Sequence, residues 1–231
     1  GYNVQTAVDA KHHIIIAHEV TNDIGDKHQL ANMATQAKAI MKREQLTVVA
    51  DRGYYKSEEI KACDDAGITT YLPKPQTSNN QAKGLFGRRD FTYMPEDDEY
   101  ECPAGERAIY RFSRVEAGKM MKRYWSSSCP RCSMKSECTT SKYRRIARWE
   151  YEAILDKLED RMDNNPNMMT VRRSTVEHPF ATLKAWMGYT HFQMKTLKRV
   201  KAEMSLHVLA YNMKRVMNIM GSVKLMEAIR A

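Results

Sequence analysis

A short apolar run that ends in an acid constrains this chain more than any other stretch. Residues 46–50 are Leu-Thr-Val-Val-Ala, and Asp51 and Gly53 follow at once. Such a run predicts a buried strand, and α/β sheets expose functional side chains at the carboxyl ends of their strands. Asp51 is therefore a candidate catalytic acid. The simpler alternative is a carboxylate that only caps the turn before Gly53.

Composition favours a soluble protein with a polyanionic partner. The 231 residues, 42% of them apolar, suffice for one large domain or for one domain that carries an insertion. No apolar run approaches the roughly 20 residues that span a bilayer. Lys and Arg outnumber Asp and Glu by 37 to 28, which favours nucleic acid as the partner. The amino terminus has neither a basic leader nor an initiator Met, so we expect a part of a longer protein.

The first 75 residues alternate between strand and helix patterns. A polar turn at 9–12 separates two β-rich runs and predicts a hairpin. Helical spacing of apolar residues and a Ser57 cap predict two helices between the later strands. This order predicts an α/β fold, a mixed sheet with flanking helices. The expected elements are hairpin strands at 2–8 and 14–20, a helix at 26–43, the strand before Asp51, a helix at 58–66 and a strand at 68–72.

Residues 76–149 differ in texture and are interpreted as a loop-rich and β-rich insertion. Six acids and no base lie in 90–101, whereas 107–148 holds twelve bases and two acids, with aromatic residues between them. A basic block of this kind suits a DNA phosphate backbone, with Arg144 and Arg145 as candidate contacts. A merely solvated basic surface is the alternative.

Four of the five cysteines lie in this insertion. Cys129 and Cys132 flank a Pro-Arg pair and form a chelating turn, and Cys102 and Cys138 could complete a tetrahedral zinc site. Such an ion would hold together a module too small to bury a core. Unpaired thiols and redox chemistry are the alternatives, since an odd number of cysteines argues against a disulfide framework. Cys63 is expected to be buried on the helix after Asp51.

Residues 150–231 are expected to be helical, with a break at 164–166. The apolar stripes after residue 205, rich in Met, are interpreted as core. Glu177 is a second candidate acid, and Arg173 and Lys184 lie on its face of a helix. A helix beside the sheet edge could bring Glu177 to Asp51 across a metal ion. An ion pair on a solvated face is the alternative, and Pro179 indicates a kink or a helix start.

Several motifs resemble those of cut-and-paste DDE transposases of bacterial insertion sequences. The resemblance covers nearly the whole chain and implies an RNase H-like fold in which three acids hold two divalent ions, Mg²⁺ or Mn²⁺. Asp51 would be the second acid and Glu177 the third, with Arg173 and Lys184 matching the arginine and lysine of the family's Tyr-Arg-Glu-Lys signature. Thr170 stands at the tyrosine position. The motifs are Gly-Tyr-Asn-Val-Gln-Thr-Ala-Val-Asp at the start, Val-Thr-Asn-Asp-Ile-Gly-Asp-Lys-His-Gln-Leu, Ala-Asp-Arg-Gly-Tyr-Tyr, Thr-Val-Glu-His-Pro-Phe-Ala-Thr-Leu-Lys and Ala-Tyr-Asn-Met-Lys-Arg.

The same resemblance implies where the first acid belongs. In such enzymes it lies on a strand before the hairpin, so this chain is expected to be the C-terminal part of a transposase that could be inactive alone. Asp9 is the only nearby substitute, and the alternation places it at the hairpin turn.

The implied function is metal-dependent DNA strand cleavage and strand transfer in transposition. Transposon ends and target DNA would be the partners, with Arg173 and Lys184 on flanking phosphates. A homo-oligomer on DNA in the bacterial cytoplasm, at the nucleoid, is expected. Two alternatives are a truncated DNA-binding remnant without catalysis and a zinc-stapled interaction module without a DNA role.

Overall fold

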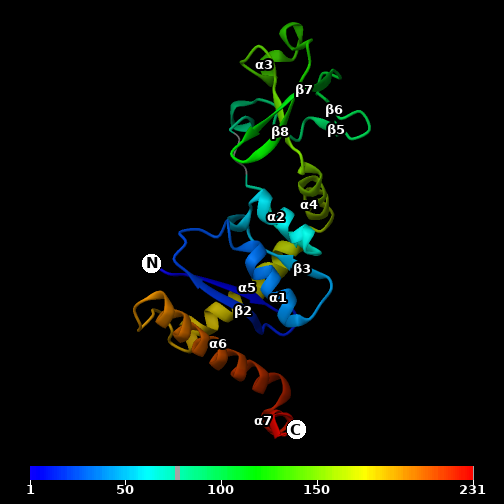
Figure 1. Cartoon of the computed structure of the whole chain (residues 1–231). Coiled ribbons are helices and arrows are strands. Elements are labelled where there is room, and N and C mark those ends of the chain that lie inside the picture. Colours follow the sequence, from blue (N-terminus) through cyan, green and yellow to red (C-terminus); the bar gives the residue numbers. More distant parts are fainter. Residues whose placement is uncertain (76–78, 231) are drawn as a thin grey trace. The chain divides into compact units, whose positions relative to one another are not determined.

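The computed structural model describes residues 1–75 and 79–230, with the side chain of Gln81 left aside (Figure 1). The chain forms two compact units. The first unit joins Gly1–Pro75 to Ile154–Ala231, and the inserted unit is Gln76–Ala153.

The first unit begins with an antiparallel hairpin of β1 (Asn3–Val8) and β2 (Ile15–Thr21). Asp9 closes its turn, because its side-chain Oδ2 accepts a hydrogen bond of 2.7 Å from the backbone N–H of His12. The hairpin prediction is confirmed, and Asp9 lies at the turn as expected.

A parallel pair of strands follows, β3 (Leu46–Val49) with β4 (Ile68–Tyr71). Helix α1 (Leu30–Met41) precedes the pair, and α2 (Ser57–Asp65) connects its strands. Gly67 ends this connection with φ +67°, a conformation that glycine adopts at no steric cost. Ser57 is the first residue of α2, so the predicted cap is off by one position and Lys56 is the N-cap.

The expected single mixed sheet is not what the described residues form. β1–β2 and β3–β4 are separate two-stranded sheets. A cavity of about 480 Å³ is lined by all residues of both β1 and β3. The hydrophobic pattern predicts each strand correctly, but it does not say which strand edges pair.

The second part of the first unit is helical, as predicted. Pro179 lies inside α5, and a π-helical turn, η4, follows that helix directly. The elements are α4 (Glu152–Asn164), α5 (Met168–Ala181), η4 (Thr182–Trp186), α6 (Leu197–Met220) and α7 (Ser222–Arg230).

Two contacts tie the points where the chain leaves and re-enters the first unit. Lys74, just after β4, forms an ion pair of 2.5 Å with Glu159 of α4. Within β4, the backbone carbonyl of Thr70 accepts a hydrogen bond of 3.4 Å from Arg161 of α4. The end of β4 and the body of α4 are thereby held together within this unit.

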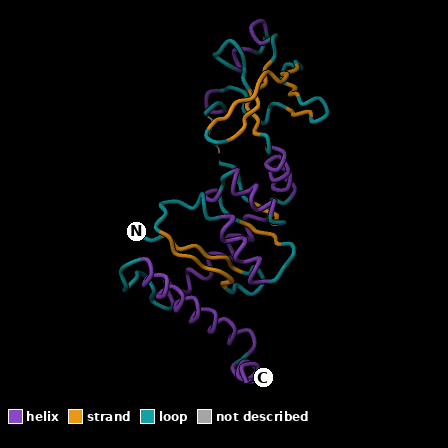
Figure 2. Tube along the Cα trace, viewed as in Figure 1, coloured by secondary structure: helices purple, strands orange, loops and turns teal. Residues whose placement is uncertain are grey.

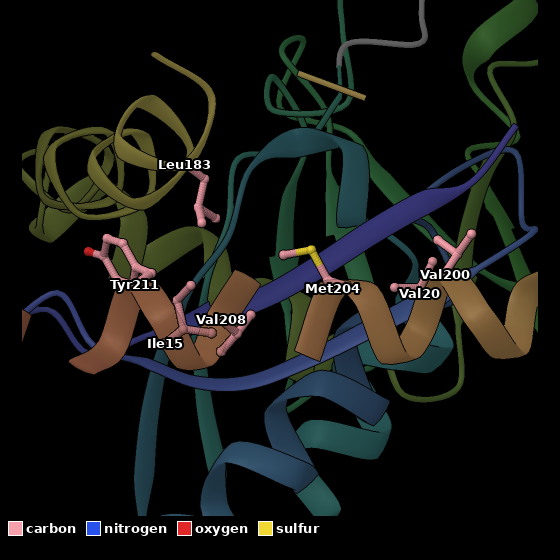
Figure 3. Packing of buried hydrophobic residues seen from close by; sticks show 7 residues of the cluster. All are labelled: Ile15, Val20, Leu183, Val200, Met204, Val208 and Tyr211. Carbon is pink, nitrogen blue, oxygen red and sulfur yellow. The ribbon is translucent and has the colours of Figure 1, made fainter. Parts of the chain in front are cut away.

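Helix α6 packs against the hairpin and builds the main core (Figure 3). Its buried residues recur at i, i+4, i+8 and i+11, which is one stripe of a helix. Asn212 reinforces the contact, because its side chain bonds both the backbone N–H and the carbonyl of Ile15, at 3.0 and 2.9 Å. The cluster consists of Ile15, Val20, Leu183, Val200, Met204, Val208 and Tyr211.

The expectation that the apolar stripes of α6 after residue 205 are core is confirmed for Val208 and wrong for most of the other residues. Only the stripe that faces the hairpin is buried, Leu197 and Val216 are half-buried, and the other large apolar residues of α6 are exposed. They are Leu206, Leu209, Met213, Met217, Ile219 and Met220.

The inserted unit is a five-stranded antiparallel meander (Figure 2). Its order, β5-β6-β7-β8-β9, follows the sequence. The tight β7–β8 turn has positive φ at Ala117 and Gly118, as two-residue hairpin turns require. Its strands are β5 (Thr92–Met94), β6 (Glu99–Glu101), β7 (Arg107–Glu116), β8 (Lys119–Trp125) and β9 (Ile146–Trp149).

A small core stabilises this unit. Its buried cluster has five members, and Cys102 and Cys138 pack against it. The cluster is Phe91, Tyr100, Ala108, Tyr124 and Ile146.

Among residues 1–75 and 79–230, no helix is both long and apolar enough to cross a bilayer.

Replacing Met204 by Ala should lower the free energy of unfolding by about 2–5 kcal/mol, because it opens a cavity between α6 and the hairpin. Met213, on the same helix, is the matched control: it is 51% exposed against 4% for Met204. Met213→Ala should change the free energy by less than about 0.5 kcal/mol. Equal effects in urea denaturation would contradict this packing.

Candidate functional site

Asp51 lies where the β3–β4 ladder ends. The backbone N–H of Ala50 still bonds Tyr71, at 2.9 Å, and Asp51 follows it as the N-cap of a 3₁₀ turn, η1 (Arg52–Tyr54). Its Oδ1 accepts a hydrogen bond of 2.8 Å from the N–H of Gly53. Asp51 thus caps this turn and also presents a carboxylate, 43% exposed, at the carboxyl end of a strand.

Gly53 leaves room for the Asp51 carboxylate at this turn. A Cβ atom there would lie 2.9 Å from Asp51 Oδ1 and 3.5 Å from Asp26 Oδ2. The first distance is below ordinary contact, so a side chain would displace the Asp51 carboxylate.

Arg172 of α5 is the side chain that α5 presents to Asp51. Its Nη2 donates a hydrogen bond of 2.7 Å to Asp51 Oδ2, in an ion pair that is partly shielded from solvent. Both Asp51 oxygens therefore have a partner, one on the turn and one on α5.

Glu177 points elsewhere on α5. It lies five residues after Arg172, which turns it by about 140° around an α-helix, and its side chain is exposed, as are those of Arg173 and Lys184. Among the described residues, no hydrogen bond or ion pair joins Glu177 to Asp51. The predicted acids are thus on neighbouring elements but are not brought into contact.

Sequence reasoning missed Asp26 as part of this group. Asp26 Oδ1 accepts hydrogen bonds from the side chains of Asn3, at 2.9 Å, and Gln5, at 2.6 Å. The hydroxyl of Tyr54 donates in turn to Gln5. Asp26 lies in the loop before α1, although the predicted helix began at this residue. Its only signal was its place in one of the transposase-like motifs.

The charges of Asp26 and Asp51 both affect the pKa of the Tyr54 phenol. Burial raises the pKa of the Tyr54 phenol, and the charges of Asp26 and Asp51 raise it further, while Arg172 opposes them. Tyr54 therefore stays protonated and serves as a hydrogen-bond donor.

The cavity between β1 and β3 opens onto this group. Asp26, Asp51 and Asp9 all contribute to its wall, together with residues of α1 and α5. Asp9 nevertheless belongs to the far end of β1, because the four residues from Gln5 to Asp9 span about 13 Å of strand. It is therefore separate from the Asp26–Asp51 group.

The donor chemistry of this group fits a divalent ion, but its arrangement does not complete a ligand set. Carboxylate oxygens are what Mg²⁺ prefers, and two carboxylates lie against Gly53. Across the described residues, however, no three His, Cys, Asp or Glu side chains are placed to hold a metal ion.

At least four of the twelve bases in 107–148 form ion pairs with acids of the inserted unit. Arg107 pairs with Asp97 at 3.6 Å, and Lys122 with Asp98 at 2.9 Å. Arg114 lies 2.6 Å from Glu116, which Arg123 also contacts. The acidic and basic segments that alternate in sequence thus pair across the sheet.

The charge of Asp98 is held by these partners. Burial raises its pKa, but hydrogen bonds from Lys122, Tyr124 and Tyr93 outweigh burial and lower it. Asp98 is therefore an anchor of the sheet.

Arg144 and Arg145, the two predicted DNA contacts of this unit, lie in different surroundings. Arg144 is half-buried, donates a hydrogen bond of 3.0 Å to the carbonyl of Phe86 and lies over the Phe91 ring. Arg145 is exposed and lies 5.6 Å from the centroid of the Trp125 ring. Arg144 thus has a structural role, whereas Arg145 is available at the surface.

Arg145 belongs to a partly exposed aromatic–cationic patch, in which Lys142 lies 5.4 Å from the centroid of the Tyr143 ring. Arg111 also stacks on Trp125, at 5.3 Å, and the rings of Phe112 and Tyr143 lie 6.0 and 6.1 Å from it. The patch comprises Arg111, Phe112, Trp125, Lys142, Tyr143 and Arg145.

The four cysteines of the inserted unit line one small cavity, and all are free thiols. Burial raises the pKa of the Cys138 thiol; Arg144 lowers it, and the other three thiols raise it. Cys63 is buried on α2, and burial raises its pKa to about 12. The first four thiols interact with one another, whereas Cys63 is an inert core residue.

Comparison with known proteins identifies a family. No curated protein and no solved structure is detectably similar to the chain. The family model described as Transposase DDE domain matches residues 1–213, which include the whole inserted unit, most of the first unit and every candidate site residue. This match covers most of the chain, and the protein therefore belongs to the DDE transposase family, whose members transfer phosphoryl groups and typically use divalent metal ions.

Proposed function

We propose that this chain carries the catalytic centre of a transposase that cleaves DNA strands and transfers them to a target. The observation that carries the proposal is Asp51, a carboxylate at the carboxyl end of β3 beside a second carboxylate, within a chain of the DDE family. The parallel β3–β4 pair, the antiparallel hairpin and the flanking helices support an RNase H-like arrangement.

Asp51 and Glu177 would hold the divalent ion, Mg²⁺ or Mn²⁺. Bound ions would activate the attacking oxygen and stabilise the leaving oxygen of an in-line displacement at phosphorus. Glu177 is included as a ligand because it matches the glutamate of the family signature. The α5 residue that contacts Asp51 in the structure is Arg172. A cation at Asp51 has to compete with Arg172 for Oδ2.

The remaining groups would hold DNA. Arg173 and Lys184 are exposed on α5 and η4 and are suited to phosphates, one as a planar fork and one as a point charge. In the inserted unit, Arg145 and Lys142 offer further phosphate contacts, beside aromatic rings on which a base can stack. The exposed apolar residues of α6 support self-association on DNA.

A second candidate function is DNA binding without catalysis. The separation of Glu177 from Asp51, and the lack of a three-ligand group among the described residues, favour it. A zinc-stapled module with no DNA role is the third.

Asp51→Asn and Glu177→Gln should each lower strand cleavage roughly 100-fold or more in the transposase that contains this chain, because each removes a ligand charge at constant volume. DNA binding should stay largely unchanged, as measured by gel shift. Asp9→Asn is the control and should cleave at the wild-type rate with Mg²⁺. Cleavage by Asp51→Asn at that rate would refute its role, and an unmutated protein that binds but never cleaves DNA would select the second function.

Arg145→Ala with Lys142→Ala should weaken binding to any DNA sequence and lower the slope of log affinity against log salt by about one unit per lost contact. Arg114→Ala removes the same kind of charge, but that charge is already paired with Glu116, so it is the matched control and should change little. An unchanged salt slope in the double variant would show that this patch is only a solvated surface.

Arg173→Ala and Lys184→Ala should lower the cleavage rate more than the affinity, because they would position phosphates beside the acids. Single-turnover cleavage at saturating enzyme, set beside equilibrium binding, separates the two effects. A loss of affinity alone would move these residues to general DNA binding.

A further inference from the structure

Two tight turns of the inserted unit each place a cysteine at their first position. Cys102 follows β6, and its carbonyl accepts a hydrogen bond of 2.8 Å from the N–H of Gly105, which has φ +75°. Cys129 follows β8, and its carbonyl accepts one of 3.3 Å from the N–H of Cys132. Both turns therefore project thiols from the end of a strand.

Strand register brings these two turns to the same end of the sheet. Tyr100 of β6 pairs with Ala108 of β7, and Ile109 of β7 pairs with Trp125 of β8. The chain that leaves β6 thus lies beside the chain that leaves β8. Thiols 27 to 30 residues apart in sequence are neighbours for this reason.

Cys138 completes the group from a third direction. It ends a short helix, α3 (Lys135–Cys138), and the preceding carbonyl, that of Glu137, accepts a hydrogen bond of 2.8 Å from the N–H of Phe86. This hydrogen bond fixes the end of α3 against Phe86, which packs on the core cluster of the inserted unit.

All four thiols line one cavity of about 30 Å³, which has room for a single small occupant. Most of its other lining is apolar, including Phe86, Phe91 and Ala108. Two cations, Lys135 and Arg144, also lie on its wall. Four thiolates around a divalent ion carry a net charge of −2, which these two cations would offset.

We propose that Cys102, Cys129, Cys132 and Cys138 bind one Zn²⁺ ion that stabilises the inserted unit. The four thiols would each release a proton, and no electron transfer is involved. The sulfurs line the cavity without converging on one point, and rotation about each χ1 moves a sulfur within it. A soft four-thiolate set takes zinc or an iron–sulfur cluster, and a cavity for one small occupant favours the single ion.

The proposed zinc site shares no residue with the group around Asp51. It gives a metal staple to a unit whose buried core cluster has only five members, a case in which metals commonly stabilise small folds.

The test uses the full chain, purified under reducing conditions with Zn²⁺ supplied and no chelator. Elemental analysis should find about one zinc per chain. Cys132→Ser and Cys138→Ser should each lose most of this zinc, and Cys63→Ala, which removes the buried thiol of α2, is the matched control and should keep it.

Because a cysteine variant could fail to fold, a second measurement uses the unmutated chain. The four cavity thiols should resist alkylation with zinc bound and react after a chelator removes it, while Cys63 should react only on denaturation. A native chain without zinc, with these thiols alkylated equally whether or not Zn²⁺ is added, would overturn the proposal. Iron in place of zinc, or two disulfides in the intact mass, would overturn it as well.

Discussion

The parallel pairing of β3 with β4 is the constraint on which the candidate site depends. The ladder extends by one bond beyond the strands, from Ala50 to Tyr71, and then stops. Asp51 is therefore the first residue of this segment whose side chain is fixed by a turn rather than by a sheet. Gly53 lets that turn close, and α5 brings Arg172 to the carboxylate. Strand β3, turn η1 and helix α5 thus together fix the position of the Asp51 carboxylate.

Local patterns predicted the elements of this chain well. The hairpin, the strand before Asp51, the helix after it and the break at residues 164–166 all follow from alternation, helical spacing or turn residues that act over a few positions. The meander of the inserted unit was expected only as β-rich, because its longest strand, β7, is mostly exposed and carries few apolar residues in alternation. Element boundaries differed by one to four residues, as capping and fraying allow.

Relations between distant segments could not be predicted in the same way. Which strand edges pair is a long-range property, so the single mixed sheet was wrong. Asp26 was predicted as the start of a helix, whereas α1 begins at Leu30 and Asp26 lies in the loop before it. A count of charges suggested that Arg144 was free for DNA, whereas Phe86 and Phe91 occupy it. The Met-rich stripes of α6 satisfied a helical pattern on several faces, and only contact with the hairpin decides which face is buried.

The ties between β4 and α4 have a consequence for how this chain tolerates change in length. The inserted unit begins after β4 and ends in α4. Two contacts join these elements, Lys74 with Glu159 and Thr70 with Arg161. To the first unit, the whole insertion is then a single closed loop. The entropy of closing a loop grows only with the logarithm of its length, and doubling it costs about 0.6 kcal/mol. The fold around Asp51 is thereby insulated from growth or loss within residues 76–153, and a change of length in that segment costs the first unit little free energy.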